Sequence, residues 1–215
     1  MIVAIDGPAA AGKGTLARAL AARFDYAYLD TGTLYRAVAV RLRRAGISPD
    51  QASAVAAARA VTADDRADPM LRDEESGRLA SKVAAIAAVR TALLDYQRQF
   101  ARHPPGDARG AVLDGRDIGT VVCPDADVKI FVTASIEARA ARRVRELAAR
   151  GAAVDAAAIR TDMEARDARD AGRRAAPLRP APDADLLDTT KLDIDSAFAA
   201  AESFILQRVE RASRP

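Results

Sequence analysis

The pattern of apolar and polar positions along the 215 residues predicts short strands that alternate with helices. Continuous apolar runs at Ile2–Ile5, Ala111–Leu113 and Val128–Val132 are typical of strands buried on both faces of a parallel sheet. Helical spacing follows the first run, over Leu16–Phe24. The alternation predicts an α/β fold with a sheet of about five parallel strands flanked by helices, with ligands at the strand C-terminal ends. Further strands are expected at 26–30 and 184–187, and further helices at 33–44, 52–61, 74–102, about 135–150, 156–171 and 194–211, with a polar loop at 62–69.

The longest of these helices, residues 74–102, has one unusual position. Its apolar stripe includes Ile86 and Leu93, and Arg90 falls between them on the same face. An arginine on an apolar face needs a partner or an anion, unless its stem packs and its head reaches water. We favour contact with a ligand.

A glycine-rich loop separates the first strand from the first helix. A loop of the form G-x-x-x-x-G-K in this setting points its backbone N–H groups at phosphate oxygens, and the helix dipole adds to the attraction. Gly7 and Gly12 supply backbone angles that a side chain would oppose, and Lys13 would place its ammonium on the β- and γ-phosphates of ATP. The residues expected to bind ATP are Gly7, Pro8, Ala9, Ala10, Ala11, Gly12, Lys13, Gly14 and Thr15.

One position in this loop departs from the usual motif. The residue after the lysine is normally Ser or Thr, whose hydroxyl binds Mg²⁺. Here it is Gly14, and the hydroxyl comes one residue later, at Thr15. This form resembles the loop of nucleoside monophosphate kinases more than that of GTPases or motor ATPases. No residue is therefore assigned as a direct ligand of Mg²⁺.

Polar side chains follow two other strands. Thr31 and Arg36 lie where a strand end meets a helix start, and offer a hydroxyl and a guanidinium. Asp114, Arg116 and Asp117 follow the buried strand at 111–113. At the strand tip Asp114 is placed to act on Mg²⁺ through water, while Arg116 would hold a phosphate and Asp117 would accept from an amine on a base.

A charged helix carries the third candidate site. Arg166, Arg169 and Arg173 are spaced so as to share a face. Three guanidiniums that converge on one point suit a phosphoryl group in transfer, whose charge spreads over its equatorial oxygens. We expect this segment to be a mobile lid that excludes water.

Composition narrows the classes of function. The net charge of +3 is mild, and no aromatic stacking platform is present, so no binding to nucleic acid is expected. Cys123 is the sole cysteine, which favours a reducing cytoplasm. No signal peptide or membrane span is expected, since Asp6 and Lys13 interrupt the N-terminal apolar run.

The motifs together resemble those of bacterial-type cytidylate kinases, a family of P-loop nucleoside monophosphate kinases. The most specific segment is Asp114–Val122, with an Ala-Pro-Leu at 176–178 downstream. The matching segments recur in order over nearly the whole chain. They are I-D-G-P at 5–8 with G-K-G-T at 12–15, L-D-T-G at 29–32 with Y-R at 35–36, A-S-K-V-A at 80–84 with V-R at 89–90, D-G-R-D-I-G-T-V-V at 114–122, R-D at 166–167 through Arg173, and L-L-D-T-T at 186–190.

The resemblance implies Mg²⁺-dependent transfer of a phosphoryl group from ATP to CMP or dCMP. It implies a core at about 1–31, 103–150 and 175–215, a mobile monophosphate-binding region at about 32–102, and an Arg-rich lid at about 151–174. By resemblance, Arg36 and Arg116 hold the CMP phosphate, and Arg166 and Asp170 lie near the sugar. The residues implied around the base are Thr31, Ser81, Arg90, Asp117 and Arg173. The partners are small nucleotides, with no membrane, and a monomer is expected.

Two details depart from a simple transfer of the family pattern. Residues 62–73 are too short for the β-rich insert that many members carry. Ser81 and Arg90 are nine residues apart, on opposite sides of an unbroken helix, so either the helix kinks or one of the two assignments is wrong.

Two alternatives remain open at this point. Another small-molecule P-loop kinase, for a different nucleoside monophosphate, has a similar loop. A GTP-dependent switch is suggested by Thr190-Lys191-Leu192-Asp193, which matches the guanine-reading [NT]-K-x-D motif. Gly14 and the lack of a D-x-x-G sequence after the strand at 111–113 count against this second reading.

Overall fold

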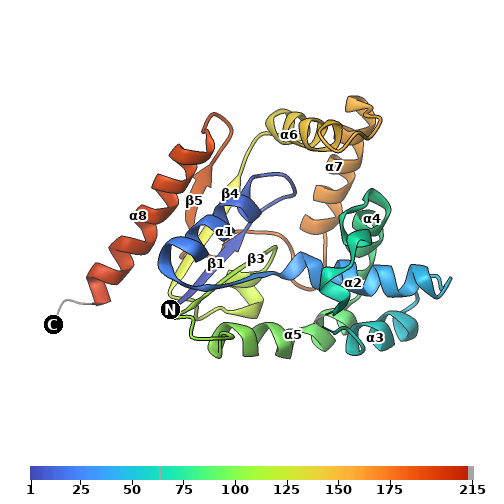
Figure 1. Cartoon of the computed structure of the whole chain (residues 1–215), viewed down its shortest axis with the longest axis horizontal. Coiled ribbons are helices and arrows are strands. Elements are labelled where there is room, and N and C mark those ends of the chain that lie inside the picture. The colour runs from blue at the N-terminus through green and yellow to red at the C-terminus, as the bar shows by residue number, and fades with distance from the viewer. Residues whose placement is uncertain (63, 213–215) are drawn as a thin grey trace. The chain divides into compact units, whose positions relative to one another are not determined.

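A five-stranded sheet forms the centre of the larger part of the molecule (Figure 1). The computed structural model describes residues 1–62 and 64–212. The strand order is β2-β3-β1-β4-β5, and β1 pairs in parallel with both β3 and β4. The predicted α/β fold with five parallel strands is therefore confirmed. The strands are β1 (Ile2–Asp6), β2 (Ala27–Asp30), β3 (Ala111–Gly115), β4 (Val128–Thr133) and β5 (Asp185–Asp188).

Helices connect the strands, and the chain divides into two compact units. Residues 1–29 and 101–215 make the larger unit, and residues 30–100 make the smaller one. The helices are α1 (Lys13–Phe24), α2 (Thr31–Arg44), α3 (Gln51–Arg59), α4 (Glu74–Val83), α5 (Ala87–Arg102), α6 (Ile136–Ala148), α7 (Ala156–Ala171) and α8 (Ile194–Ala212), with a π-helix at Ile118–Val122.

The core of the larger unit lies between the sheet and two helices. Leu16 and Leu20 of α1, with Ile205 of α8, pack on apolar residues of the central strands such as Ile5 and Ile130. All five are buried. Because β1 and β4 are apolar on both faces, they occupy the middle of the sheet and bring their C-terminal ends to one edge. The glycine-rich loop follows β1 at that edge.

The core of the smaller unit is entirely helical. Leu34 and Val38 of α2 pack with Ala58 of α3, Val83 of α4 and Val89 of α5. α3 begins with a capping box in which Asp50 accepts from the backbone of Ser53. This unit owes its stability to packing of amphipathic faces rather than to a sheet.

The prediction of one continuous helix over 74–102 is wrong. α4 ends at Val83 and α5 begins at Ala87. At the break the N–H groups of Ala85 and Ile86 bond three residues back, to Lys82 and Val83, which tightens the last turn. No Gly or Pro marks the break, and apolar spacing continues across it because both helices contribute to the same core.

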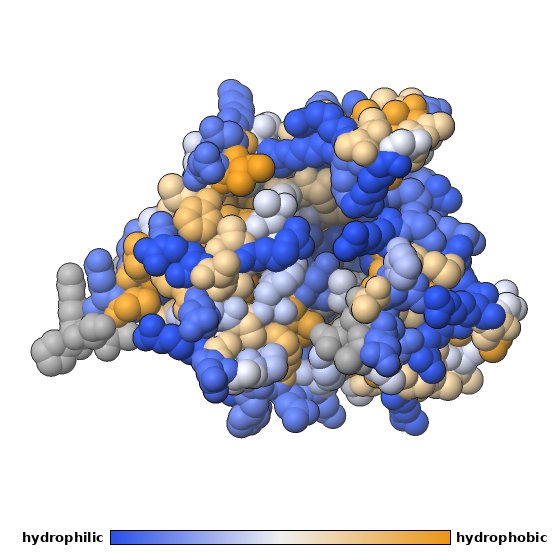
Figure 2. All heavy atoms as spheres, viewed as in Figure 1, coloured by the Kyte–Doolittle hydropathy of each residue, from blue (hydrophilic) through white to orange (hydrophobic). Residues whose placement is uncertain are grey.

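The polar loop expected at 62–69 contains short helical turns. Asp64–Ala67 and Pro69–Arg72 are 3₁₀-helices, and residue 63 lies outside the described residues. No helix within residues 1–62 and 64–212 is both long enough and apolar enough to cross a membrane. Hydrophilic side chains dominate the face drawn in Figure 2.

Candidate active site

The glycine-rich loop, residues 7–12, joins β1 to α1 in the form expected of a phosphate cradle. Gly7 and Gly12 have φ of 150° and 92°. Gly12 is the N-cap of α1 in a left-handed conformation, and no side chain caps the helix. Ala10 also has a positive φ, of 58°, which the sequence does not reveal because Ala gives no signal for it. This backbone leaves the helix N-terminus as an anion site.

Position 7 requires glycine because the backbone there passes close to β4 and leaves no room for a side chain. A Cβ atom on Gly7 would lie 2.0 Å from the carbonyl oxygen of Val132. The start of the loop is therefore fixed against the strand beside it.

Two arginines of α6 fix the outer side of the loop. Arg139 Nη1 donates to the Ala9 carbonyl at 3.3 Å, and Arg142 Nη1 donates to the Ala11 carbonyl at 3.4 Å. Thr189, after β5, donates to the same Ala11 carbonyl at 2.9 Å. These bonds occupy carbonyl groups of the loop, which is consistent with a loop whose N–H groups are offered to an anion. Neither arginine was predicted to belong to the site, because α6 is rich in arginine and nothing local marks Arg139 as the buried one.

Lys13 begins α1 and is buried at 8 % exposure. Its Nζ lies 3.4 Å from the Pro8 carbonyl, so the ammonium folds over the loop that it would share with a phosphate. Thr15, on the same helix, is exposed.

Asp114 borders the loop from the end of β3. Its carboxylate is buried, and Oδ2 accepts from the Tyr28 hydroxyl at 2.9 Å. A Cβ atom on Gly14 would lie 3.2 Å from this oxygen. The carboxylate thus lies beside the position where other loops carry their metal-binding hydroxyl.

The buried carboxylate of Asp114 is the group in this region that could serve a magnesium ion brought in with substrate phosphates. Within residues 1–62 and 64–212, no cluster of three His, Cys, Asp or Glu side chains is arranged to hold a metal. Mg²⁺ keeps several waters and takes one or two carboxylates plus substrate phosphates. Asp114 beside the glycine-rich loop meets that requirement.

The buried carboxylate of Asp170 lies close to three arginines. Arg116 Nε lies 3.0 Å from Asp170 Oδ2, Arg166 Nε lies 4.0 Å from it, and Arg173 bonds Oδ1. Burial alone raises the pKa of the Asp170 carboxyl, but the charges of Arg116, Arg173 and Arg166 outweigh this, so the pKa lies below its usual value. Arg169, predicted to join the other arginines of α7, is exposed.

A second ion pair connects α7 with α6. Arg139 Nη2, on α6, lies 2.7 Å from Oδ2 of Asp167, on α7. Since Arg139 also reaches the carbonyl of Ala9, one guanidinium joins the proposed lid helix to the glycine-rich loop.

Asp6 is buried at the end of β1, and Asp117 is buried directly before the π-helix at Ile118–Val122. Asp6 accepts from the N–H groups of Ile118 at 2.7 Å and Gly119 at 2.8 Å. Burial, only partly offset by these two bonds, raises the pKa of Asp6 to about 7. Asp6 escaped the sequence-based search because its partners lie more than a hundred residues away.

The smaller unit holds the other predicted residues. Thr31 and Ser81 are buried, and Arg36 Nη1 donates to the carbonyl of Leu71 at 2.6 Å. A Cβ atom on Gly77 would lie 3.0 Å from the Arg36 guanidinium, so this glycine makes room for it. Gly77 was not singled out from the sequence, although a lone glycine within a predicted helix is a signal that could have marked it.

Arg90 is buried at 9 % exposure, which excludes the reading in which its head reaches water. Its guanidinium carbon lies 5.3 Å from the centre of the Tyr35 ring, and Nη1 donates to the Ala84 carbonyl at 3.3 Å. It therefore caps the broken end of α4. Because the helix breaks between Ser81 and Arg90, the two can be buried in the same unit.

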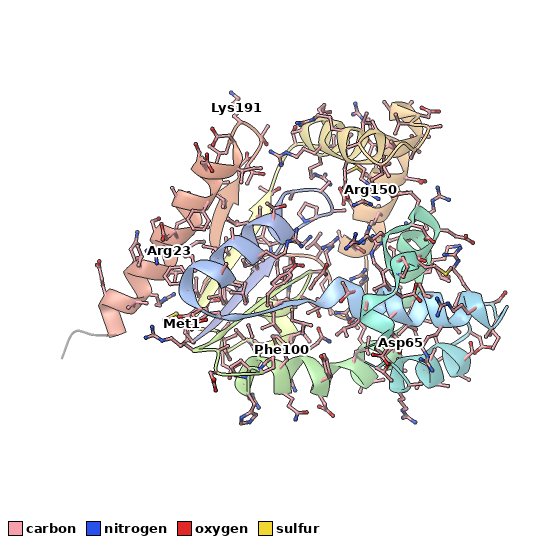
Figure 3. The ribbon with its side chains drawn as sticks, in the orientation of Figure 1. Met1, Arg23, Asp65, Phe100, Arg150 and Lys191 are labelled. Atoms are coloured by element: carbon pink, nitrogen blue, oxygen red, sulfur yellow. The ribbon has the colours of Figure 1, made fainter. Side chains whose placement is uncertain are left out.

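The segment that matches a guanine-reading motif has other structural uses. Asp193 accepts from the backbone of Ser196 at 2.7 Å and so caps α8. Thr190 donates to Asp188 at 2.5 Å, and Lys191 is exposed and points away from the ribbon in Figure 3. This use of the carboxylate does not favour a GTP switch.

Comparison with known proteins identifies close relatives. The family model described as Cytidylate kinase matches residues 3–205. The chain is 59 % identical over 205 residues to a cytidylate kinase of Paramagnetospirillum magneticum, covering 95 % of this chain and 97 % of that protein. It is 53 % identical over 212 residues to a cytidylate kinase of Rhodospirillum rubrum, and the match covers 98 % of this chain and 100 % of that protein.

One solved structure supports the fold alone. It is an uncharacterized protein from Eubacterium ventriosum, with a TM-score of 0.57 and 15 % identity. The match covers 96 % of this chain and 98 % of that one.

We expect Gly7→Ala to lower the free energy of unfolding by about 3 kcal/mol or more, because the new Cβ would overlap a backbone oxygen of β4. Gly106→Ala is the matched control, since Gly106 also has a positive φ but its Cβ would meet nothing within 4 Å. That control should lose about 1–2 kcal/mol. Chemical denaturation of both variants measures the difference, and equal losses would contradict the packing argument.

We expect Asp170→Asn to destabilise the protein by about 3 kcal/mol at pH 7, because partly buried arginines lose the charge of a buried carboxylate. The lowered pKa means that this stabilisation is present above about pH 4 and is lost as the pH falls through the native value. The difference in the free energy of unfolding between wild type and Asp170→Asn should therefore shrink at acid pH.

Denaturation at pH 7 and pH 3 measures that gap. Asp162→Asn, at an exposed position of the same helix, serves as control and should change little. An equal gap at both pH values for Asp170→Asn would rule out the electrostatic explanation.

Proposed function

Because this chain belongs to the cytidylate kinase family, we infer that it transfers the γ-phosphoryl group of ATP to CMP and dCMP, yielding ADP with CDP or dCDP. The observation that carries this conclusion is the match over residues 3–205, which includes every residue assigned to ATP and CMP. The enzyme is thus a nucleoside monophosphate kinase of pyrimidine nucleotide metabolism.

The donor side is supported by the glycine-rich loop. Its hydrogen-bonded carbonyls and left-handed Gly12 are consistent with N–H groups offered to the β- and γ-phosphates, and Lys13 adds a positive charge there. Asp114 would hold Mg²⁺ through water. When bound, Mg²⁺ neutralises charge on the phosphate oxygens. This chain's own part is to align the donor for an in-line attack by the CMP phosphate.

The arginines around Asp170 support binding of the CMP phosphate and of the phosphoryl group in transfer. Arg116 would bind the CMP phosphate, and Arg166 and Arg173 would meet the charge that spreads over the transferring group. Asp170 orients all three guanidiniums before substrate arrives, so less reorganisation is needed during transfer. We assign Arg169 to the transferring phosphoryl group as well, reached by movement of a lid at about 151–174.

The base is read by groups that suit cytosine. Asp117 would accept from the N4 amine, while Arg90 would donate to N3 and O2. Uracil reverses the polarity at positions 3 and 4, so the site should prefer CMP to UMP. Thr31, Ser81 and Arg36 complete the acceptor assignments in the smaller unit.

The proposed location, oligomeric state and partners are those of an enzyme that acts on small molecules. We propose a cytoplasmic monomer; the sole cysteine, Cys123, is a buried thiol outside any disulfide, which supports a reducing compartment. Small nucleotides are its proposed partners.

We expect kcat/KM to be highest for CMP and dCMP, and about tenfold or more lower for UMP and AMP. A coupled assay of ADP release with the four acceptors at fixed ATP measures this. Asp117→Asn should narrow the ratio of CMP to UMP, because an amide can donate to the O4 of uracil. AMP as the best acceptor would show that the base assignments are wrong and favour a different monophosphate kinase.

We expect Arg36→Ala and Arg116→Ala to raise the KM for CMP by about tenfold or more, with a smaller effect on the KM for ATP. Arg166→Ala should chiefly lower kcat, because its charge is needed during transfer. Initial-rate kinetics with each substrate varied measure the split. Arg59→Ala, at an exposed position of the smaller unit, is the control. Unchanged kinetics in all three variants would remove these assignments.

A further inference from the structure

Thr189 lies directly after β5 and is buried. Its backbone N–H donates to the carbonyl of Thr133, the last residue of β4, at 2.8 Å. This bond continues the parallel pairing of β4 with β5 by one residue. The side chain of Thr189 is thereby fixed at the end of β4, the strand beside β1 and the glycine-rich loop.

The hydroxyl of Thr189 has one hydrogen to donate and two carbonyl oxygens within reach. The carbonyl of Thr133 lies 3.1 Å away and already accepts from the Thr189 N–H. The carbonyl of Ala11, in the glycine-rich loop, lies closer, at 2.9 Å. Arg142 Nη1 donates to the hydroxyl oxygen at 3.0 Å, which leaves the hydroxyl hydrogen for a carbonyl. These distances favour Ala11 as the acceptor.

The carbonyl of Ala11 needs a donor from the protein because water does not reach it. Ala11 is fully buried in the core between α1 and the sheet. A second donor, Arg142 Nη1, lies at 3.4 Å, which is long for a hydrogen bond. A buried carbonyl is costly to leave unsatisfied, so the Thr189 hydroxyl determines where this carbonyl points.

The orientation of the Ala11 carbonyl also sets the direction of the Gly12 N–H. The two groups belong to one trans peptide, so they point in opposite directions. A carbonyl held toward Thr189 therefore turns the N–H of Gly12 away from Thr189. Gly12 is the N-cap of α1, at the helix end that attracts an anion.

Packing does not fix this peptide. Gly12 has φ of 92°, and among the described residues a Cβ there would meet only the Arg142 guanidinium, at 4.0 Å. Since glycine adopts both signs of φ readily, the peptide between Ala11 and Gly12 could rotate at little steric cost. Gly7 differs, because β4 encloses it. Hydrogen bonds to the Ala11 carbonyl are what hold the peptide in one orientation.

We propose that Thr189 is a positioning residue for ATP: its hydroxyl holds the peptide between Ala11 and Gly12 so that the Gly12 N–H faces the phosphates. This inference rests on the proposed function, because it takes ATP as the ligand of the loop. Thr189 touches neither nucleotide nor reacting atoms in this role, and acts through the carbonyl of Ala11.

Thr189→Val tests the requirement for the hydroxyl, because valine keeps the branched shape of the side chain. We expect the KM for ATP and the Kd for ADP to rise about tenfold, while the KM for CMP stays within about threefold. Thr189→Ser keeps the hydroxyl, so its Kd for ADP should stay within about threefold of that of wild type. Initial-rate kinetics and isothermal titration calorimetry measure these constants. Thr161→Val is the matched control, since Thr161 donates to the Ala157 carbonyl at an exposed position of α7 and its loss should change neither KM.

The amide proton of Gly12 gives a readout that a merely structural role would not move. An amide that donates to a phosphate moves downfield in the proton dimension of an NMR spectrum. In wild type, the Gly12 amide should move downfield when ADP saturates the protein. In Thr189→Val at saturating ADP, that movement should be at most half as large, while the amide of Gly106, in an open loop, stays in place in both proteins.

Equal weakening of ADP binding by valine and serine, a lower melting temperature with an unchanged Kd for ADP, or an equal Gly12 shift in both proteins would overturn the inference. If valine prevents folding, Thr189→Ala removes the hydroxyl without adding a methyl group, and its comparison with serine decides. A wild type that binds ADP but does not phosphorylate CMP would remove the proposed acceptor, and the ADP measurements would still decide the role of Thr189. A wild type that does not bind ADP would overturn both.

Discussion

The contact between the backbone of Gly7 and the carbonyl oxygen of Val132 is the constraint on which the site depends. It fixes the exit of β1 against β4, with no room for a side chain. α6 follows β4, so the same strand that pins the start of the loop also sets the position of Arg139 and Arg142 on its outer side. The pairing of β1 with β4 therefore also determines the shape of the glycine-rich loop and the orientation of its N–H groups.

Charge balance is the second organising feature. A site for two phosphorylated nucleotides needs several cations, and those cations repel one another when nucleotides are not bound. The negative charge of Asp170 reduces this repulsion among Arg116, Arg166 and Arg173. Asp167 does the same for Arg139. The acidic residues interleaved along α7 thus do more than stabilise a solvated helix, since Asp170 is almost fully buried.

The sequence was sufficient for the sheet and the glycine-rich loop, because both depend on local signals: apolar runs, glycines and a helix start. The sequence was insufficient for features that depend on contacts between residues far apart along the chain. Val83 and Val89 keep the apolar spacing across a break because they join one core, so the break between α4 and α5 carries no local mark. Arg139 contacts Ala9, 130 residues away, and Asp167, and only the fold brings these together. The predicted site residues lie in both units, and their roles remain predictions.

The place of β1 in the middle of the sheet has a consequence for synthesis. β1 is made before β3 and β4, and its partners in the sheet begin at Ala111 and Val128, so Ile2 cannot pair until Ala111 has also left the ribosome. The smaller unit, residues 30–100, is continuous and emerges completely in that interval. At about 5–20 residues per second, the apolar first strand waits several seconds for its neighbours. During that delay the nascent chain carries an unpaired apolar strand, which is prone to aggregate until β3 and β4 are made.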